Sequence, residues 1–537
     1  MKKILIKITK NKYYLFFALL FFNALFFAVF AVLLPIHFDP QGIDDAKFCL
    51  IASGAYTGTP DAHLVFINYI YGLILTFFYS HLYGVVEWYM LFFSIIHVVS
   101  LTIFCFFILK SKKNKWIKLV YSALLYTFSI IFITSVQFTS LAAFCALAGL
   151  VLILSIRKTT QIAGIVWFLL ASLIRFDAAM LVLLIMLPLF GYEILKTKQW
   201  IKILPFVLIA ILALTFRYID SRQYQNCINH EKAVKFNYYR QRINDNPNFA
   251  RVQKNLPDEI SQNDFVLIND FFVDTKIVTF EKIQKLYKSY QNLPLKYKIK
   301  NSLQAMQKKI WLLLFVVLLY FLLFFQNKNW LMRLMLISVI IVLFGSITYV
   351  TMQDYLKGRV LLSMMLPIFF ISFVASYERT YIHTTMIGIF VVVMFSKALV
   401  DNHKYNERLK NDMPYYTQAL NHIKEQNLSV VFFFDWFTVL KPFEITKTFE
   451  NVKIKSIAGY FHYLKLRDDF YIDSHERLLE NDINLFIPRG WDKEMASYIQ
   501  KNLLENYNID TQIVTKYQNE KYSIFQIKKI VKLPVLT

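Results

Sequence analysis

The stretch that decides the fold lies near the start of the chain: YYLFFALLFFNALFFAVFAVLLPIHFDPQGIDD, residues 13–45. Residues 13–36 are almost entirely apolar, and about 20 such residues suffice to cross a bilayer as a helix. The run is too long for the core of a signal peptide, so we expect a retained first helix. Two adjacent carboxylates, Asp44 and Asp45, follow it. An acidic pair beside a membrane costs free energy, which makes it the first candidate for a functional site.

The composition is that of a membrane protein. Hydrophobic residues make up 57% of the chain and aromatic residues 17%, with a mean hydropathy of +0.43. The formal charge of +23 would suggest a nucleic-acid partner in a soluble chain, but short cytoplasmic loops of membrane proteins also collect Lys and Arg. The four cysteines show no paired spacing, which argues against a disulfide framework or a zinc site.

Apolar segments long enough to span recur throughout the chain, and we expect about eleven transmembrane helices. They are 13–36, 86–109, 117–135, 139–156, 162–175, 178–195, 200–217, 310–326, 334–351, 360–376 and 383–400. A further apolar stretch, 62–82, is interrupted by polar residues. If it crossed, the Lys-rich loop 110–118 would fall outside the cell. The positive-inside rule therefore favours an interfacial helix at 62–82 within one long external segment, 36–85.

This topology gives the expected fold class, an α-helical polytopic membrane protein with a small external α/β domain. The membrane domain is 1–400 and includes a large external helical insertion at 217–309. The C-terminal domain is 401–537. Short β-like runs at 429–434, 484–487 and 522–527 alternate there with amphipathic helical stretches at 415–425 and 494–506. The N-terminus is expected in the cytoplasm and the C-terminal domain outside, in a bacterial cytoplasmic membrane.

Asp44 and Asp45 are candidates for a general base. A carboxylate can remove a proton from an attacking hydroxyl, and desolvation near a bilayer raises its pKa towards neutrality. The alternative is a helix cap, because Asp is favoured at a helix start such as this one. Both can hold, with one Asp as cap and the other as base.

Four cationic and acidic residues further along the chain mark the outer ends of helices. Arg175 and Asp177 flank a junction between two short apolar segments, where they either pair with each other or hold an anionic headgroup. Lys357 and Arg359 precede the segment 360–376, where they either snorkel or hold a phosphate. Arg359 is the best single candidate for binding a lipid phosphate.

Four further polar residues are secondary candidates. Asp61 and His63 follow a Gly- and Pro-containing turn in the first external segment, and a structural role is the more common one for such a His. Asn237 and Arg240 share a helical face in the insertion, and such faces are usually just solvated.

The chain carries no phosphate-cradling Gly-rich loop and no His/Cys metal spacing. Charges are nearly missing from the apolar segments, which argues against an ion-coupled transporter.

These features together resemble the GT-C superfamily of integral-membrane glycosyltransferases. The resemblance lies in the first helix followed by Asp44-Asp45, in the run Gly358-Arg359-Val360-Leu361-Leu362 leading to Pro367, and in the external C-terminal domain. The Asp-Asp pair, the Gly-x-x-x-Gly-x-Pro-Asp element ending at Asp61 and the Phe-Asn-x-x-Arg element ending at Arg240 look like those of bacterial members involved in surface polysaccharide.

The resemblance implies a sugar donor on a polyprenyl phosphate or diphosphate and a glycan, lipid or protein acceptor. It implies that Asp44 or Asp45 acts as the base with inversion at the anomeric carbon, and that Arg359, with Lys357 or Arg175, stabilises the leaving phosphate. No cofactor is certain, although some relatives use a divalent metal. No nucleic-acid partner is expected.

Two other classes of protein remain open. One is a polysaccharide polymerase or ligase of the O-antigen or capsule type, which would use arginines in the large external region 217–309. The other is a non-enzymatic glycolipid flippase, which would need a polar cavity among helices that look too apolar for one.

Overall fold

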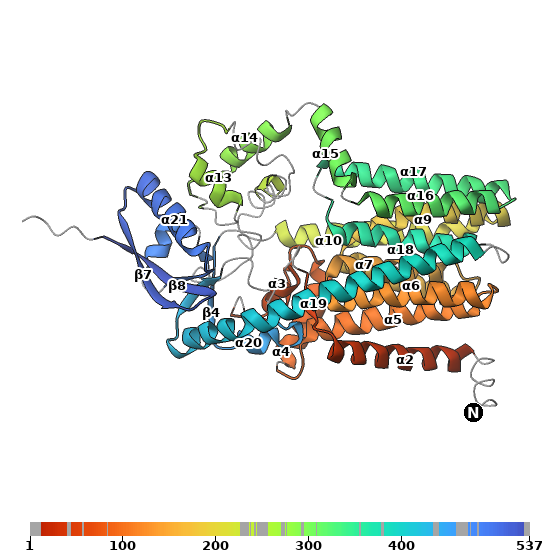
Figure 1. Cartoon of the computed structure of the whole chain (residues 1–537), viewed down its shortest axis with the longest axis horizontal. Helices are drawn as coiled ribbons and strands as arrows, with labels where there is room; N and C mark the ends of the chain where they lie inside the picture. The colour runs from red at the N-terminus through yellow and green to blue at the C-terminus, as the bar shows by residue number, and fades with distance from the viewer. Residues whose placement is uncertain are drawn as a thin grey trace, which may run out of the picture.

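The computed structural model describes most of the chain (Figure 1). The described residues are 12–39, 44–55, 58–82, 84–225, 236, 238–240, 243, 256–269, 274, 276–291, 295–307, 309–353, 356–376, 381–432, 440–457, 471–472, 474–480 and 483–530.

Each of the eleven apolar segments expected from the sequence forms a helix of one bundle (Figure 1). In the described part of the chain, eight helices are long and apolar enough to cross a membrane, and three apolar helices are shorter. The long ones are α2 (Lys12–Leu33), α5 (Trp88–Lys110), α6 (Lys115–Thr134), α9 (Phe176–Thr197), α10 (Leu204–Gln225, preceded by η1, Trp200–Ile203), α17 (Trp330–Gln353), α18 (Gly358–Ala375) and α19 (Tyr381–Glu425). The shorter ones are α7 (Phe138–Ile153), α8 (Lys158–Ile174) and α16 (Ile310–Gln326). The expected polytopic helical class is therefore confirmed.

The two ends of the bundle differ in charge and in what they carry. Figure 1 shows the N-terminal end of α2 at one end of the bundle and the β-sheet beyond the other. The connections after α5, α7, α9 and α16, which carry most of the Lys and Arg of the short loops, lie at the end of the N-terminus. There the Lys113 Nζ donates to the carbonyl oxygens of Val374, at 2.9 Å, and Ser376, where a cation meets the negative end of α18.

Helix α7 forms the centre of the bundle. Almost all of its residues are buried, and it packs against α5, α8, α9 and α18. Gly149 on α7 and Gly164 on α8 let these two helices approach closely. A Cβ built on Gly149 would lie 2.7 Å from the backbone N of Phe168, and one on Gly164 would lie 2.6 Å from the Gly149 O. Small residues at such crossings allow the close backbone packing that holds helices together in lipid.

The segment between α2 and α5 folds into two helices at the end of the bundle that faces the sheet: α3 (Asp44–Ser53) and α4 (Tyr69–His81). The helix expected at 62–82 is shorter in the structure and begins only at Tyr69. Asn68 sets this start, because its side-chain oxygen accepts from the Ile70 N–H as an N-cap at 3.0 Å. The Tyr69 N–H in turn donates to Asp220 of α10 at 2.7 Å, which fixes the entry to the helix.

Two short strands place α3 beside the start of α7. Strand β1 (His37–Phe38) pairs in parallel with β2 (Ser135–Val136), with His37 opposite Ser135. The link between α2 and α3 is thereby attached to the link between α6 and α7. The acidic pair at the start of α3 consequently lies next to the N-terminus of α7.

The C-terminal region is a six-stranded sheet with helices, as expected for a small α/β unit. Its strand order is β5-β4-β3-β6-β8-β7, with β3 to β6 parallel and with β8 antiparallel to both β6 and β7. The strands are β3 (Ser429–Phe432), β4 (Lys453–Ile457), β5 (Tyr471–Ile472), β6 (Ile483–Pro488), β7 (Thr511–Gln518) and β8 (Tyr522–Lys529). The helical elements are η3 (Pro442–Glu444), α20 (Ile445–Thr448), η5 (His475–Leu479) and α21 (Asp492–Tyr507). The sequence indicated β3, β6, β8 and α21 but missed β4, β5 and β7.

The insertion 217–309 contributes α13 (Gln262–Asn269), α14 (Phe280–Gln291) and α15 (Leu295–Gln307). It contacts the C-terminal region through buried polar groups. Asp274 accepts from the His475 N–H and from the Tyr507 hydroxyl, both at 2.8 Å, and the Asn502 Nδ2 donates to Asp264 at 3.1 Å.

Candidate active site

The two adjacent carboxylates at the start of α3 point to different places. Asp45 is fully buried, and its Oδ1 accepts from the Tyr89 hydroxyl at 2.5 Å and from the Phe138 N–H at 2.9 Å. Burial raises the pKa of the Asp45 carboxyl well above its usual range, against the opposing effect of the Tyr89 hydrogen bond. Asp45 therefore ties α3 to α5 and to the N-terminus of α7.

Asp44 instead lines a cavity of about 640 Å³ between α3, α7, α9, α17 and α18. Successive residues of a helix are about 100° apart around its axis, so one neighbour can face the interior while the other faces a cavity. Asp44 is thus the member of the pair that a bound molecule could reach.

Arg175 forms one wall of the cavity. Arg175 is both the C-cap of α8 and the N-cap of α9. Its side chain therefore starts at the junction between the two apolar segments that the sequence analysis identified. The guanidinium lies over the rings of Phe66, at 4.9 Å, and Phe138, at 5.5 Å, and it pairs with Asp177 at 3.3 Å. Stacking of this kind holds the planar cation in place.

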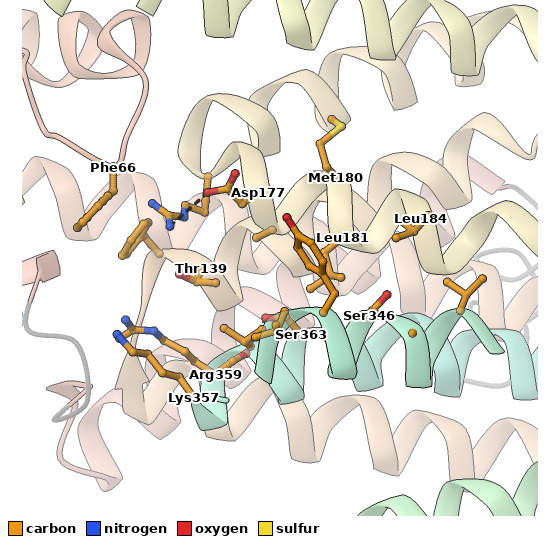
Figure 2. A pocket seen from close by; sticks show the side chains of 18 of the residues that line it. Phe66, Thr139, Asp177, Met180, Leu181, Leu184, Ser346, Lys357, Arg359 and Ser363 are labelled. Carbon is orange, nitrogen blue, oxygen red and sulfur yellow. Dashed lines mark hydrogen bonds and ion pairs between the residues drawn. The ribbon is translucent and has the colours of Figure 1, made fainter. Parts of the chain in front are cut away.

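Lys357 and Arg359 form the opposite wall, at the start of α18. Figure 2 shows their side chains extending together into one end of the cavity. The Arg359 Nη1 lies 3.8 Å from the Asp39 Oδ2, and both side chains are largely buried. Arg175 lies close enough to Arg359 and to Asp44 for the charge of each to act on it.

Three helix N-termini meet at this charged end. Residues from the first turns of α7, α9 and α18 line the cavity, and each of these turns carries the positive end of a helix dipole. The positive charge of these helix ends and of Arg175, Lys357 and Arg359 exceeds the negative charge of the two lining carboxylates, Asp44 and Asp177. This end is suited to an anionic group such as phosphate.

The other end of the cavity is apolar. Its lining comes from the sides of two membrane-crossing helices, with Met180, Leu181 and Leu184 on α9 and Val342 on α17. Leu184 and Ser346 lie away from the cationic pair in Figure 2. The cavity therefore offers a charged place for a headgroup and an apolar one for a hydrocarbon chain.

Two further buried charged residues, Lys47 of α3 and Glu87 close to α3, do not line the cavity. Lys47 lies one turn after Asp44 and is buried, and burial lowers its pKa to about 7, although Asp44 opposes the shift. Glu87 lies at the N-terminal end of α5, where Tyr79 donates to it and the Thr446 hydroxyl of α20 donates at 2.6 Å. Burial raises the pKa of Glu87 to about 7. Through Thr446, the C-terminal region contacts the membrane part next to the site.

The remaining candidates from the sequence lie elsewhere. Asp61 and His63 pair with each other at 2.7 Å, and the His63 ring packs on Tyr224 of α10, away from the lining of the cavity. Arg240 is completely buried and acts electrostatically on Lys47 without lining the cavity. Asn237 lies outside the described residues.

Several lining residues gave no sequence signal. Phe66, Phe138, Thr139 and Tyr349 look like ordinary core or membrane residues in the sequence, and only the fold brings them to the cavity. Asp39 lies beside this cavity in the polar stretch after α2, and no pattern in the sequence predicts its pairing with Arg359. Within the described residues, no group of three or more His, Cys, Asp or Glu side chains is placed to hold a metal ion.

Comparison with known proteins gives one structural likeness. No family model matches the sequence, and no curated protein matches it. A crystal structure of ArnT from Cupriavidus metallidurans in the apo state is similar over 93% of this chain and 97% of that chain, with 10% sequence identity and a TM-score of 0.41. Because the identity and the TM-score are this low, the likeness supports no conclusion about chemistry.

Proposed function

We propose that this chain is a membrane glycosyltransferase of the GT-C type, which transfers a sugar from a polyprenyl-linked donor to a glycan, lipid or protein acceptor. The observation that carries the proposal is the cavity that joins Asp44, Arg175, Lys357 and Arg359 at one end to apolar helix sides at the other. A polyprenyl phosphate has the same two parts, a phosphate and a long hydrocarbon chain.

Asp44 acts as the general base in this proposal. It takes the proton of the acceptor hydroxyl, whose oxygen forms a bond to the anomeric carbon as the bond from that carbon to the phosphate oxygen breaks. The bonding electron pair leaves with the phosphate, and the configuration of the sugar inverts. Loss of a positioned base typically lowers the rate by about 10²- to 10⁴-fold.

Arg359, Lys357 and Arg175 hold the donor phosphate and stabilise the charge that builds on it. Each preorganised donor of this kind contributes roughly 10²- to 10³-fold in rate. Asp45 positions α3 through Tyr89 and Phe138 and takes no proton from the acceptor, because it is fully buried and does not line the cavity.

The proposal places the cavity on the outer side of the membrane, with the N-terminus in the cytoplasm. The support is the collection of basic loops at the opposite end of the bundle. A test uses two exposed lysines at opposite ends, Lys112 and Lys410. Both variants carry Cys227→Ser, because Cys227 belongs to the insertion expected outside. In sealed cells, a membrane-impermeant maleimide is expected to label the Lys410→Cys variant and to leave the Lys112→Cys variant unlabelled. The reverse pattern would rule out an external site.

The central test separates binding from transfer. Native mass spectrometry measures binding of undecaprenyl phosphate to the full-length protein, and transfer of radiolabelled sugar from a panel of polyprenyl-phosphate sugars measures activity. Asp44→Asn is expected to keep binding and lose transfer, whereas Arg359→Gln weakens both. Asp177→Asn is the matched control, because it removes the other carboxylate of the same cavity.

Two outcomes contradict this assignment. Full transfer activity in Asp44→Asn would show that Asp44 is not the general base. Equal losses of transfer activity in Asp44→Asn and Asp177→Asn would show that activity depends only on the net charge of the cavity. Loss of long polymer with intact transfer of single sugars would instead favour a polysaccharide polymerase or ligase. Translocation of a lipid-linked sugar with no transfer in any variant would favour a flippase.

A further inference from the structure

A second cavity, of about 480 Å³, lies on the other side of Arg359. It is enclosed by the start of α18, the middle of α19, the outer end of α6, the β1–β2 pair and the first residues of α16. Arg359 is the residue that the linings of both cavities share. The ion pair of Arg359 with Asp39 thus stands at the boundary between the two spaces.

The lining of the second cavity is cationic. Its basic side chains are Lys309, Arg359, Lys397, Lys404 and Arg408, against the carboxylates of Asp39 and Asp401. Lys397 pairs with Asp401 at 3.3 Å and Arg359 with Asp39 at 3.8 Å. Among the described residues, Lys309 and Lys404 form no ion pair, so their charges are available to an anion.

A buried amide adds a second, independent observation. Gln137 is 2% exposed, and its side chain lines this cavity. Its Oε1 accepts from the Thr139 N–H at 2.7 Å as the N-cap of α7, which leaves the Nε2 as the free donor. No partner for this Nε2 lies in the described part of the chain. Because an unmade buried hydrogen bond is costly, this donor indicates a ligand with acceptor oxygens.

The lining of the second cavity also has an apolar part, which includes Trp311, Leu312, Leu361, Leu362 and Met394. Trp311 and Leu312 come from the outer end of α16, and Met394 comes from the part of α19 that crosses the bundle. This side of the cavity suits a hydrocarbon chain, as the corresponding part of the first cavity does.

We propose that the second cavity binds the acceptor, and that the acceptor is an amphiphile with a phosphate attached to a hydrocarbon chain. The inference rests on the proposed function and narrows its acceptor from a glycan, lipid or protein to one chemical class. Lys309, Lys404 and the Gln137 Nε2 hold the phosphate. The sugar or other hydroxyl-bearing part extends past Arg359 towards Asp44, while the donor occupies the first cavity.

Trp311 supplies a local probe for binding. The full-length protein is placed in phosphatidylcholine nanodiscs that contain a small fraction of lipid with brominated acyl chains, which quench nearby tryptophan. The Trp311 signal is the difference between the wild type and Trp311→Phe. Brominated phosphatidic acid is expected to quench Trp311 at a lower fraction than brominated phosphatidylcholine does. The double variant Lys309→Gln/Lys404→Gln should lower the apparent affinity by about tenfold or more, because hydrogen bonds to charged groups are strong.

Lys410→Gln is the matched control. Lys410 is exposed on the same helix as Lys404, pairs with Glu407 at 3.2 Å and does not line the cavity, so its loss should leave quenching unchanged. Equal quenching by the two brominated lipids, or unchanged preference in the double variant, would overturn the proposal. Displacement of the brominated phosphatidic acid by millimolar inorganic phosphate alone would show a site for free phosphate, which also overturns it.

The same variants separate this inference from the proposed function. With a working transfer assay, Lys404→Gln is expected to raise the KM for the acceptor and leave the KM for the donor unchanged. Lys357→Gln, which changes only the first cavity, should do the opposite. Selective quenching without any dependence of transfer on Asp44 would contradict the catalytic assignment and leave the second cavity in place. Transfer that depends on Asp44 without selective quenching would contradict only the second cavity.

Discussion

Glu87 allows a prediction whose size and sign follow from the structure. The carboxyl accepts from Tyr79 and Thr446 at the contact between α5 and the C-terminal region, and burial raises its pKa from 4.5 to about 7. A shift of this size corresponds to roughly 3 kcal/mol, since each pKa unit is worth about 1.4 kcal/mol. Glu87→Gln keeps the shape of the side chain and resembles the protonated acid.

The sign follows from the raised pKa. The folded state binds the Glu87 proton more tightly than the unfolded chain, so this contribution to stability is complete below the unfolded pKa of 4.5 and is lost as the pH rises through about 7. The wild type is therefore expected to be within about 1 kcal/mol of Glu87→Gln near pH 5 and about 3 kcal/mol less stable than the variant at pH 8. The difference between the two proteins cancels the titration of other groups, including Lys47.

Equilibrium unfolding of the full-length protein in mixed micelles, at several pH values between 5 and 8, measures this difference. Glu444→Gln serves as the control, because Glu444 lies in the same part of the C-terminal region but is exposed and paired with Lys441 at 3.5 Å. It should produce no pH-dependent difference from the wild type. An offset between Glu87→Gln and the wild type that stays constant from pH 5 to pH 8 would refute the reasoning.

Three shorter predictions concern packing and positioning. Gly149→Ala should lower the thermal midpoint, at a cost of about 1–3 kcal/mol or more from overpacking against α8, whereas Gly191→Ala should not, because nothing lies within 4 Å of its added Cβ. Asp45→Ala should lower the thermal midpoint more than Asp45→Asn, since alanine leaves two buried donors unpaired at roughly 1–3 kcal/mol each; equal losses would contradict the positioning role. Thr446→Val should increase proteolysis of the C-terminal region by removing the hydrogen bond to Glu87, and unchanged cleavage rates would show that the contact is not a main one.

The sequence predicted the membrane architecture well, for a physical reason. A helix that crosses a lipid bilayer must be long and apolar, and a continuous stretch of the sequence shows both properties. Each apolar segment could therefore be found without knowing which helices pack against it. The short basic loops that the charge asymmetry grouped together also lie at one end of the bundle. The start of the interfacial helix was harder to predict, because Asn68 interrupts an apolar stretch that otherwise continues from residue 62.

The site could be predicted only in part. Arg175, Asp177, Lys357 and Arg359 stand at helix ends, where a short polar interruption is visible in the sequence, and all four line the same cavity as Asp44. The choice between Asp44 and its neighbour depends on which face of α3 meets Tyr89 and Phe138, which is a tertiary contact.

Long-range contacts explain the other differences. His63 lies against Tyr224, far along the chain, and no local pattern predicts this contact. The pairing of β7 with β8 and the contact of Thr446 with Glu87 also join distant parts of the sequence. The weakly apolar strand β7, largely exposed on the edge of the sheet, carries little periodic signal of its own.

Helix α19 has a mechanical consequence. It runs for 45 residues from the bundle into the C-terminal region, which corresponds to about 68 Å at 1.5 Å per residue. Because one continuous helix joins the bundle to the sheet, any change in the number of its residues both rotates and shifts the sheet relative to the bundle. One residue inserted after position 400 would turn everything beyond it by about 100° and would draw Thr446 away from Glu87. A whole number of turns would restore the phase, so tolerance of insertions should rise and fall with the helical repeat.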